Sequence, residues 1–351
     1  MLKRSFKASA GLYDRISQGL GKAPPKDTRA LTMKQKGYAD VKKLGKGAFG
    51  HAVLVVREET REHFVAKYMR YKDLSKTEKE FIYREVDTMR RLSNEGGHPY
   101  VVRFRESFVL ANGKLCIIMD YCDGGDLSQL ISAQRKRKAL FHEQQVHLWL
   151  LQLLTAIDFL HKHKVLHRDI KPANVFMHSG VAKLADLGLS KQVMDKQTGK
   201  QKHTQCGSPL YLAPEVHMGR SYDKAVDIWS LGCTLFEMMM QTHAFVGENN
   251  AEILSNIAWA RHAPILSSQW SKELCAIVKW MLALKPEDRP TALEVLEEPL
   301  FADALRANAI APSAVAHIAE GARPGFKKNS PASTMELTVP NPKPPCTIDH
   351  L

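Results

Sequence analysis

The sequence contains no pair of cysteines in a C-x-x-C spacing, and no apolar run of about 18 residues that could form a membrane-spanning helix. Its six cysteines are scattered along 351 residues, a length at which a chain does not depend on disulfides to fold. We therefore expect free thiols in a reducing compartment. The N-terminus also lacks the long apolar core of a secretory signal, although its basic, acid-poor composition leaves a mitochondrial presequence as an alternative.

Most of the net charge of +13 lies at one end of the chain. Residues 1–37 hold nine Lys or Arg against two Asp, whereas residues 302–351 are close to neutral. The composition of both segments predicts a basic, disordered leader and a disordered Pro/Ser/Ala-rich tail around one domain at 38–301. A charged leader suits an acidic partner or surface better than a nucleic acid, so we expect no nucleic-acid binding.

Residues 38–301 divide into two regions with different secondary-structure patterns. Up to residue 122, short β-branched and aromatic runs are separated by turn signals such as Asn112-Gly113, and a capping box at Ser75 and Glu78 announces one helix. From residue 123 helical periodicity dominates. We therefore predict an α+β protein with two lobes, a small β-rich lobe with one main helix and a larger helical lobe, and a ligand site in the cleft between them.

The stretch "LGKGAFGHAV" carries glycines at 45, 47 and 50, the spacing G-x-G-x-x-G. In a dinucleotide-binding fold such a loop leads into a helix, but here it leads into the β-branched run "HAVLVV". We therefore expect the loop to join two strands and to fold over a nucleotide. Glycine is suited to this place because, without a Cβ, the backbone amides can approach the phosphates closely.

Further motifs indicate which chemistry the nucleotide serves. They are "HRDIKPAN" at 167–174, "ADLGLS" at 185–190 and "GSPLYLAPE" at 207–215. With Lys67 in "FVAKYM" and Glu85 in the predicted helix, they resemble the protein-kinase signature in its proper order, and Lys171, two residues after Asp169, is the pattern of serine/threonine kinases. "MDYCDGGDLSQLI" and "KLADLGLSK" are similar to the NIMA-related (NEK) serine/threonine kinases.

The resemblance implies catalytic roles, and the residue types fit because phosphoryl transfer requires charge to be positioned and neutralised. Lys67, held by Glu85, would contact the α- and β-phosphates, and Lys171 would reach the γ-phosphate. Asp169 would accept the proton of the substrate hydroxyl. The family's HRD histidine, here His167, is expected to support the loop and not to act as a base.

The resemblance also implies Mg²⁺ as cofactor and ATP as co-substrate. Asn174 and Asp186 would supply the hard oxygen ligands that Mg²⁺ prefers. Within the ATP site, Met119 would be the gatekeeper, Leu44 and Val53 would cover the adenine, and Asp126 would reach the ribose. The full set of predicted ATP-binding residues is Leu44, Gly45, Lys46, Gly47, Ala48, Phe49, Gly50, Val53, Lys67, Met119, Asp120, Cys122 and Asp126.

Regulation and support are predicted from the same resemblance. Thr204 is the expected activating phosphosite, with Arg168 as the cation that meets its phosphate. Ser208 would help to position the substrate hydroxyl. Leu187 stands where most kinases have Phe, as it does in some NIMA-related kinases. Asp227 would anchor the catalytic loop.

Two other features lie outside the catalytic set. Glu215 and Arg289 resemble the family's buried ion pair. The basic run "RKRK" at 135–138 is expected to be a solvated loop between two helices, with a nuclear-localisation signal or a nucleic-acid patch as alternatives.

The sequence thus predicts a protein kinase acting on serine and threonine, and the alternative is a catalytically silent kinase-fold scaffold or docking module. The family resemblance suggests a role in the cell cycle or at microtubules and cilia, with a cytoskeletal partner for the leader. The expected compartment is the cytoplasm, with the cytoskeleton, centrosome, basal body or nucleus as alternatives.

Overall fold

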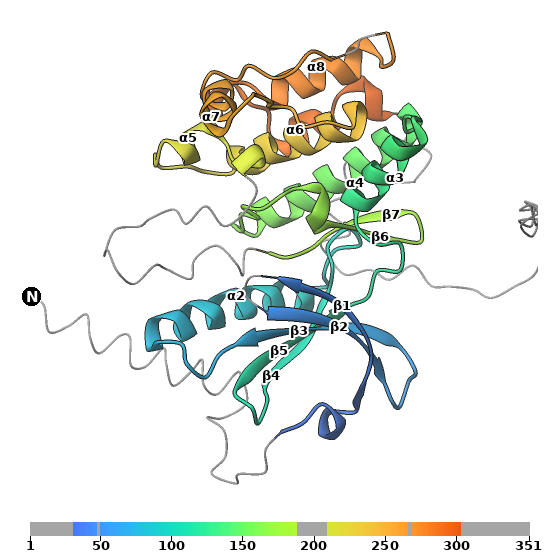
Figure 1. Cartoon of the computed structure of the whole chain (residues 1–351), viewed down its shortest axis with the longest axis vertical. Helices are drawn as coiled ribbons and strands as arrows, with labels where there is room; N and C mark the ends of the chain where they lie inside the picture. Colours follow the sequence, from blue (N-terminus) through green and yellow to red (C-terminus); the bar gives the residue numbers. More distant parts are fainter. Residues whose placement is uncertain (1–30, 48–49, 188–208, 266–267, 303–351) are drawn as a thin grey trace, which may run out of the picture. The chain divides into compact units, whose positions relative to one another are not determined.

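The structure is a computed structural model that describes residues 31–47, 50–187, 209–265 and 268–302. The remaining residues, and the side chains of residues 46 and 47, lie outside the described part. A β-rich lobe is followed in sequence by a helical lobe, so the predicted α+β class with two lobes is confirmed (Figure 1).

The smaller lobe is built on one antiparallel sheet of five strands in the order β1-β2-β3-β5-β4. The strands are β1 (Tyr38–Gly47), β2 (Gly50–Arg57), β3 (His63–Arg70), β4 (Phe104–Val109) and β5 (Lys114–Asp120). β4 and β5 form the hairpin that the pair Asn112-Gly113 predicts. Gly113 has φ 74°, a left-handed conformation that glycine adopts without strain.

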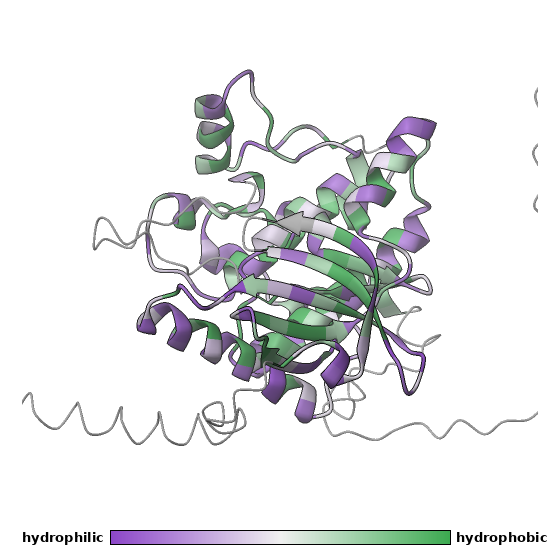
Figure 2. Ribbon diagram, turned by 60° about the horizontal axis from the view of Figure 1, so that its bottom comes forward, coloured by the Kyte–Doolittle hydropathy of each residue, from purple (hydrophilic) through white to green (hydrophobic). Residues whose placement is uncertain are grey.

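Helix α2 (Lys76–Asn94) is the single long helix of the smaller lobe. It begins at the predicted capping box, in which Ser75 N–H donates to Glu78 Oε2 at 2.7 Å and Glu78 N–H donates back to Ser75 Oγ at 3.3 Å. Its buried side chains, among them Ile82, Val86 and Met89, lie three or four residues apart and therefore share one side of the helix. Figure 2 shows this division as alternating hydrophilic and hydrophobic turns.

The face of the sheet away from α2 carries a separate apolar cluster, here called the outer apolar cluster. Leu31 and Met33 pack against this cluster. The segment between them and β1 forms a short 3-10 helix, η1 (Lys34–Lys36), and Lys36 Nζ lies 3.0 Å from Glu106 Oε2 of β4. Residues 31–37 therefore belong to the folded lobe, which corrects the predicted leader boundary at residue 37. Leu31 and Met33 give this short segment enough apolar surface to dock despite its lysines.

The larger lobe is helical, with α6 buried along nearly its whole length and α4 buried from Trp149 to Leu160. Its helices are α3 (Leu127–Arg137), α4 (Glu143–Lys162), α5 (Pro214–His217), α6 (Ala225–Met240), α7 (Asn250–Ala258), α8 (Lys272–Met281) and α9 (Ala292–Leu296). Two strands, β6 (Val175–His178) and β7 (Val181–Leu184), form a small second sheet, and β7 packs on α4. Within the described ranges, no helix is long and apolar enough to cross a membrane.

The basic run at 135–138 does not form the predicted loop. Arg135, Lys136 and Arg137 make the last turn of α3, and Lys138 caps the helix with φ 53°. Long unbranched side chains favour a helix, and cations in its last turn oppose the partial negative charge of its C-terminal carbonyls. Both effects favour the extension of α3 through Arg137, so the predicted loop begins later.

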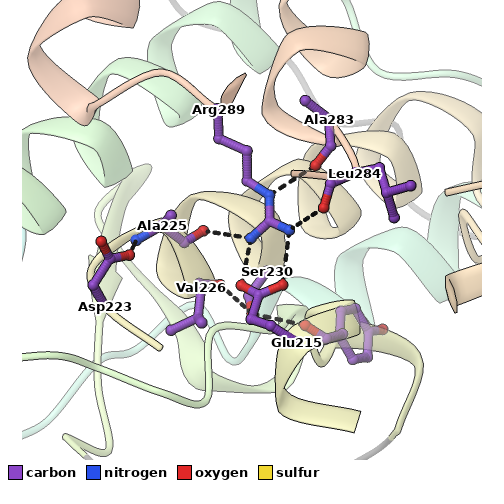
Figure 3. A network of polar contacts seen from close by, with 9 residues as sticks. Glu215, Asp223, Ala225, Val226, Ser230, Ala283, Leu284 and Arg289 are labelled. Atoms are coloured by element: carbon purple, nitrogen blue, oxygen red, sulfur yellow. Dashed lines mark hydrogen bonds and ion pairs between the residues drawn. The ribbon is translucent and has the colours of Figure 1, made fainter. Parts of the chain in front are cut away.

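A buried ion pair joins distant segments of the larger lobe (Figure 3). Arg289 Nη1 lies 2.7 Å from Glu215 Oε1, and Nη2 lies 2.9 Å from Oε2. The same guanidinium also donates to three backbone carbonyls, those of Ala225, Ala283 and Leu284. The predicted pair is confirmed, and its geometry is the bidentate one that Arg forms best with a carboxylate.

Replacing Arg289 with Met tests how much this ion pair contributes to the stability of the fold. The Glu215 carboxylate would stay buried without a counter-charge, so the free energy of unfolding should fall by about 3–5 kcal/mol. The control Arg57→Met removes a 40% exposed arginine that pairs with Glu106, and it should cost less than about 1 kcal/mol. Urea unfolding followed by tryptophan fluorescence measures both, and equal losses would contradict the assignment.

Candidate active site

One buried carboxylate fixes the loop that carries the predicted catalytic motif. Asp227 of α6, 1% exposed, accepts the backbone N–H groups of His167 at 2.9 Å and of Arg168 at 2.8 Å. His161 Nε2 lies 2.9 Å from the same carboxylate. Burial alone would raise the pKa of Asp227, but the hydrogen bond from His161 and the other donors hold that pKa below its ordinary value. The carboxylate therefore stays charged, and the predicted anchoring role is confirmed.

His167 is completely buried and bonded at both ring nitrogens. Its Nδ1 accepts the N–H of Asp169 at 3.3 Å, so the proton is assigned to Nε2, which lies 2.8 Å from the carbonyl of Ala185. Burial lowers the pKa of His167, so the ring is neutral. The structure confirms that this histidine supports the loop, since neither nitrogen is available to a substrate.

Asp169 lies at the centre of a small hydrogen-bonded group. Lys171 Nζ lies 3.0 Å from Asp169 Oδ2. Asn174 Nδ2 donates to the same oxygen at 3.0 Å and to the Asp169 carbonyl at 2.7 Å. The carboxylate is thus oriented by two donors, one of which carries a full positive charge. The short 3-10 turn η2 (Pro172–Asn174) provides the geometry that brings Asn174 back to the loop.

Asp186 lies next to this group and meets a lysine from the other lobe. Its Oδ1 is 2.6 Å from Lys67 Nζ of β3. The preceding residue, Ala185, donates its N–H to the carbonyl of Asn174 at 3.0 Å, which ties the two motifs together. Asp186 has φ 60°, a conformation that is uncommon for a residue other than glycine and here directs the carboxylate at Lys67.

The residues predicted to bind a metal ion fit Mg²⁺ in their chemistry. Asn174 makes both of its side-chain hydrogen bonds through Nδ2, and Asp186 makes its ion pair through Oδ1. Within the described part of the chain, Asn174 Oδ1 and Asp186 Oδ2 have no hydrogen-bond partner. Both are hard oxygen donors, and Mg²⁺ in nucleotide sites needs only one or two protein ligands besides phosphate and water.

Glu85 does not hold Lys67 in this structure, contrary to the prediction. No ion pair joins the two residues, although both are described, and Lys67 is paired with Asp186 instead. Burial in α2 raises the pKa of Glu85, and the positive charge of Arg168 opposes this effect. The pairing depends on the position of α2 relative to β3, which a capping box and helical periodicity do not determine.

Leu187, which stands in place of the usual Phe, is buried beside α2. It lines a small cavity together with Met89 and Leu92 of α2 and Phe159 of α4. The leucine therefore fills the apolar position beneath the helix that carries Glu85, as the sequence predicts.

The strand register corrects the prediction for Val53. Opposite residues of an antiparallel pair share one face of the sheet, and Lys67 lies opposite Ala52 of β2 and Ile117 of β5. Val53 is opposite Ala66, on the face that packs against the outer apolar cluster. Because side chains alternate along a strand, Ala52 and not Val53 shares the face of Lys67.

The predicted hinge follows β5. Met119 is buried, and the N–H of Asp120 donates to the carbonyl of Arg103 at 3.0 Å, which fixes the strand end. Burial raises the pKa of Cys122 to about 11, so its thiol stays protonated and unreactive. Asp126 accepts the N–H of Gln129 at 3.1 Å as the N-cap of α3, a second role that the resemblance does not supply.

The glycine loop is described only in part. A Cβ at Gly45 would meet nothing within 4 Å, whereas a Cβ at Gly50 would lie 1.7 Å from the carbonyl oxygen of Tyr68. Gly50 is therefore required by the close approach of β2 and β3. Leu44 is 43% exposed at the edge of this loop. Four predicted features lie outside the described residues or side chains: Lys46 and Gly47, the loop tip Ala48 and Phe49, the phosphosite Thr204, and Ser208.

Residues 38–301 match the protein kinase domain family. This chain belongs to the protein kinase family. It is 36% identical over 266 residues to the serine/threonine-protein kinase Nek5 of Homo sapiens, an alignment that covers 75% of this chain and 36% of that protein. It is 38% identical over 266 residues to Nek6 of Oryza sativa subsp. japonica, covering 75% of this chain and 47% of that protein. The predicted resemblance to NIMA-related serine/threonine kinases is confirmed.

The similarity is confined to part of the relatives. A putative serine/threonine-protein kinase A of Trypanosoma brucei brucei is 34% identical over 274 residues, which cover 76% of this chain and 62% of that protein. The chain thus spans less than two thirds of the length of each of these relatives.

Sequence reasoning missed two contributors to the kinase site. Ala52 carried no signal of its own, because alternation along one strand does not fix its register against the strand that carries Lys67. His161, which bonds Asp227, gave no signal because it lies outside the motif, as the penultimate residue of α4.

A pair of substitutions tests the register. Ala52→Phe adds a ring on the face of Lys67, so ATP should bind about tenfold or more weakly, as expected for overpacking a closed site. Val53→Ala should leave the KM for ATP unchanged and lower the free energy of unfolding by about 1–2 kcal/mol. Steady-state kinetics and urea unfolding distinguish the two, and a raised KM in the Val53 variant alone would reverse the assignment.

Proposed function

We propose that this chain transfers the γ-phosphate of Mg-ATP to serine and threonine hydroxyls of proteins. The observation that supports this most directly is the convergence of the Asp169 group with the Lys67–Asp186 ion pair, which joins the two lobes. Membership of the protein kinase family and the similarity to serine/threonine-protein kinases support the same conclusion.

The geometry gives each residue a distinct task. Asp169 accepts the proton of the attacking hydroxyl, and the donors Lys171 and Asn174 keep its carboxylate in place. Lys171 also carries positive charge beside the phosphoryl group as it transfers, and Lys67 does so at the phosphates that remain. Bound Mg²⁺, held by Asn174 and Asp186, would neutralise charge on the phosphates.

Replacing Asp169 with Asn removes the proton acceptor and should lower kcat by at least about 100-fold. Asp73→Asn, an exposed position before α2, is the matched control and should keep full activity. The measurement is phosphate incorporation into casein with Mg-ATP, with the modified residues mapped. Labelling of serine or threonine by the wild type and by the Asp73 variant, but not by the Asp169 variant, supports the proposal. A silent wild type, even after phosphorylation of Thr204 by another kinase, would favour the scaffold alternative.

We further propose that the Lys67–Glu85 pair forms on activation. The charge of Arg168 now acts on the Glu85 carboxylate. A phosphate on Thr204 would offer Arg168 a stronger anion, because a phosphate carries close to two negative charges. Glu85 would then lose that attraction, and Lys67 is the cation that the family places opposite it.

Glu85→Gln tests this pairing in protein that is already phosphorylated on Thr204. Loss of one charged hydrogen bond should lower kcat by about 10- to 100-fold. Glu80→Gln, on the same helix and without a recorded ion pair among the described residues, is the control and should retain activity. Wild-type turnover in the Glu85 variant would show that Asp186 alone holds Lys67 in the working enzyme.

A further inference from the structure

Four consecutive cations lie at the C-terminal end of α3. Arg135, Lys136, Arg137 and Lys138, here named the α3 basic end, are all exposed. Among the residues that the structure describes, none of the four takes part in an ion pair. The helix dipole favours a cation in this turn, but one cation suffices for that effect, and four adjacent charges repel each other. Helix stability therefore does not account for the run.

Helix α3 runs from the candidate active site to this cluster, whose surroundings are here called the rim. α3 starts at Asp126, the residue expected at the ribose, and packs against η2, the turn that contains Asn174. Its eleven residues span about 16 Å, so the basic end lies about that far from the helix start. At that end, Gln241 Nε2, from the C-cap of α6, donates to the carbonyl of Ala139 at 2.5 Å.

The carboxylate beside this rim is already occupied. Glu237 near the end of α6 accepts the hydroxyl of Tyr211, lies 3.3 Å from His243 Nδ1, and has a side chain only 12% exposed. The hydrogen bond to Glu237 raises the pKa of His243, and the charge of Arg135 opposes this. Tyr211 lies three residues after Ser208, which is predicted to help to position the substrate hydroxyl. Glu237 is therefore not available to a substrate here, whereas the four cations have no ion-pair partner among the described residues.

We propose that the α3 basic end binds an acidic, Asp- or Glu-rich segment of the protein substrate, close to the acceptor serine or threonine. Charge complementarity carries this assignment, since exposed unpaired cations attract carboxylates and repel a basic segment. It rests on the proposed kinase activity and adds a substrate class to it. The expected preference is modest, because exposed ion pairs are weak and screened by salt.

Peptide kinetics test the preference. Peptides with one serine acceptor carry three Asp or Glu on one side, three on the other, or neutral residues in their place. The better acidic peptide should show a kcat/KM about fivefold or more above the neutral one, the gain expected from one or two exposed ion pairs. Lys136→Glu with Arg137→Glu should abolish the difference and leave the neutral peptide unchanged, and the Gln pair should reduce it.

The matched control reverses two charges elsewhere. Lys272→Glu with Lys279→Glu on α8 changes the net charge equally and should keep the acidic preference. No acidic preference in wild type, or an equal loss with the α8 variant, would overturn the proposal.

A binding measurement separates this proposal from the proposed activity. Fluorescence anisotropy of the labelled acidic peptide with the full chain measures binding without turnover. It therefore tests the acidic preference even if the protein transfers no phosphate. Binding should weaken with the α3 reversal and with added salt. A single-stranded oligonucleotide could instead bind more tightly than the peptide and lose affinity with the same reversal. That result would overturn the proposal and identify a nucleic acid as the ligand of the α3 basic end.

Discussion

The negative charge of Asp227 is the constraint on which the catalytic site depends. A charged carboxylate with 1% exposure is stable only if donors surround it, and the available donors are His161 and the backbone of the catalytic loop. The loop therefore has one place where it satisfies the carboxylate. Arg168 accepts φ 65° to present its N–H there, a conformation that costs free energy outside glycine. Rigidity at Asp169 thus follows from satisfying a buried charge on α6.

The same logic separates residues that hold the site from residues that act in it. Asp227, His167 and Glu215 are buried with complete sets of partners, so their charges or tautomers are fixed. Asp186 and Lys67 are about a quarter to a third exposed, so their ion pair is open to solvent. Groups of the first kind resist a change in charge, and groups of the second kind are the ones that the proposed function assigns to phosphate and metal binding.

The sequence predicted the fold class, the hairpin at Asn112-Gly113, the helix cap at Ser75 and the buried pair of Glu215, because each is signalled by a short local pattern. It failed at Val53, because the sequence of β2 does not fix its register against β3, and a shift of one residue reverses the face. The sequence also did not predict the ion-pair partner of Lys67. Lys67 pairs with Asp186 in the structure and not with Glu85, which the sequence predicted, because a local pattern does not fix how α2 lies against the sheet.

The Lys67–Asp186 pair also suggests why partner exchange suits this site. Asp186 is the anion that pairs with Lys67 in this structure. A divalent cation held by Asp186 and Asn174 would repel the lysine charge and compete for the same oxygens. Lys67 would then gain most from the nucleotide phosphates and from a carboxylate on α2, which is the position of Glu85. Nucleotide binding and movement of α2 are therefore expected to favour each other. Each gives Lys67 a new anionic partner and so relieves the competition between Lys67 and the cation for the Asp186 carboxylate.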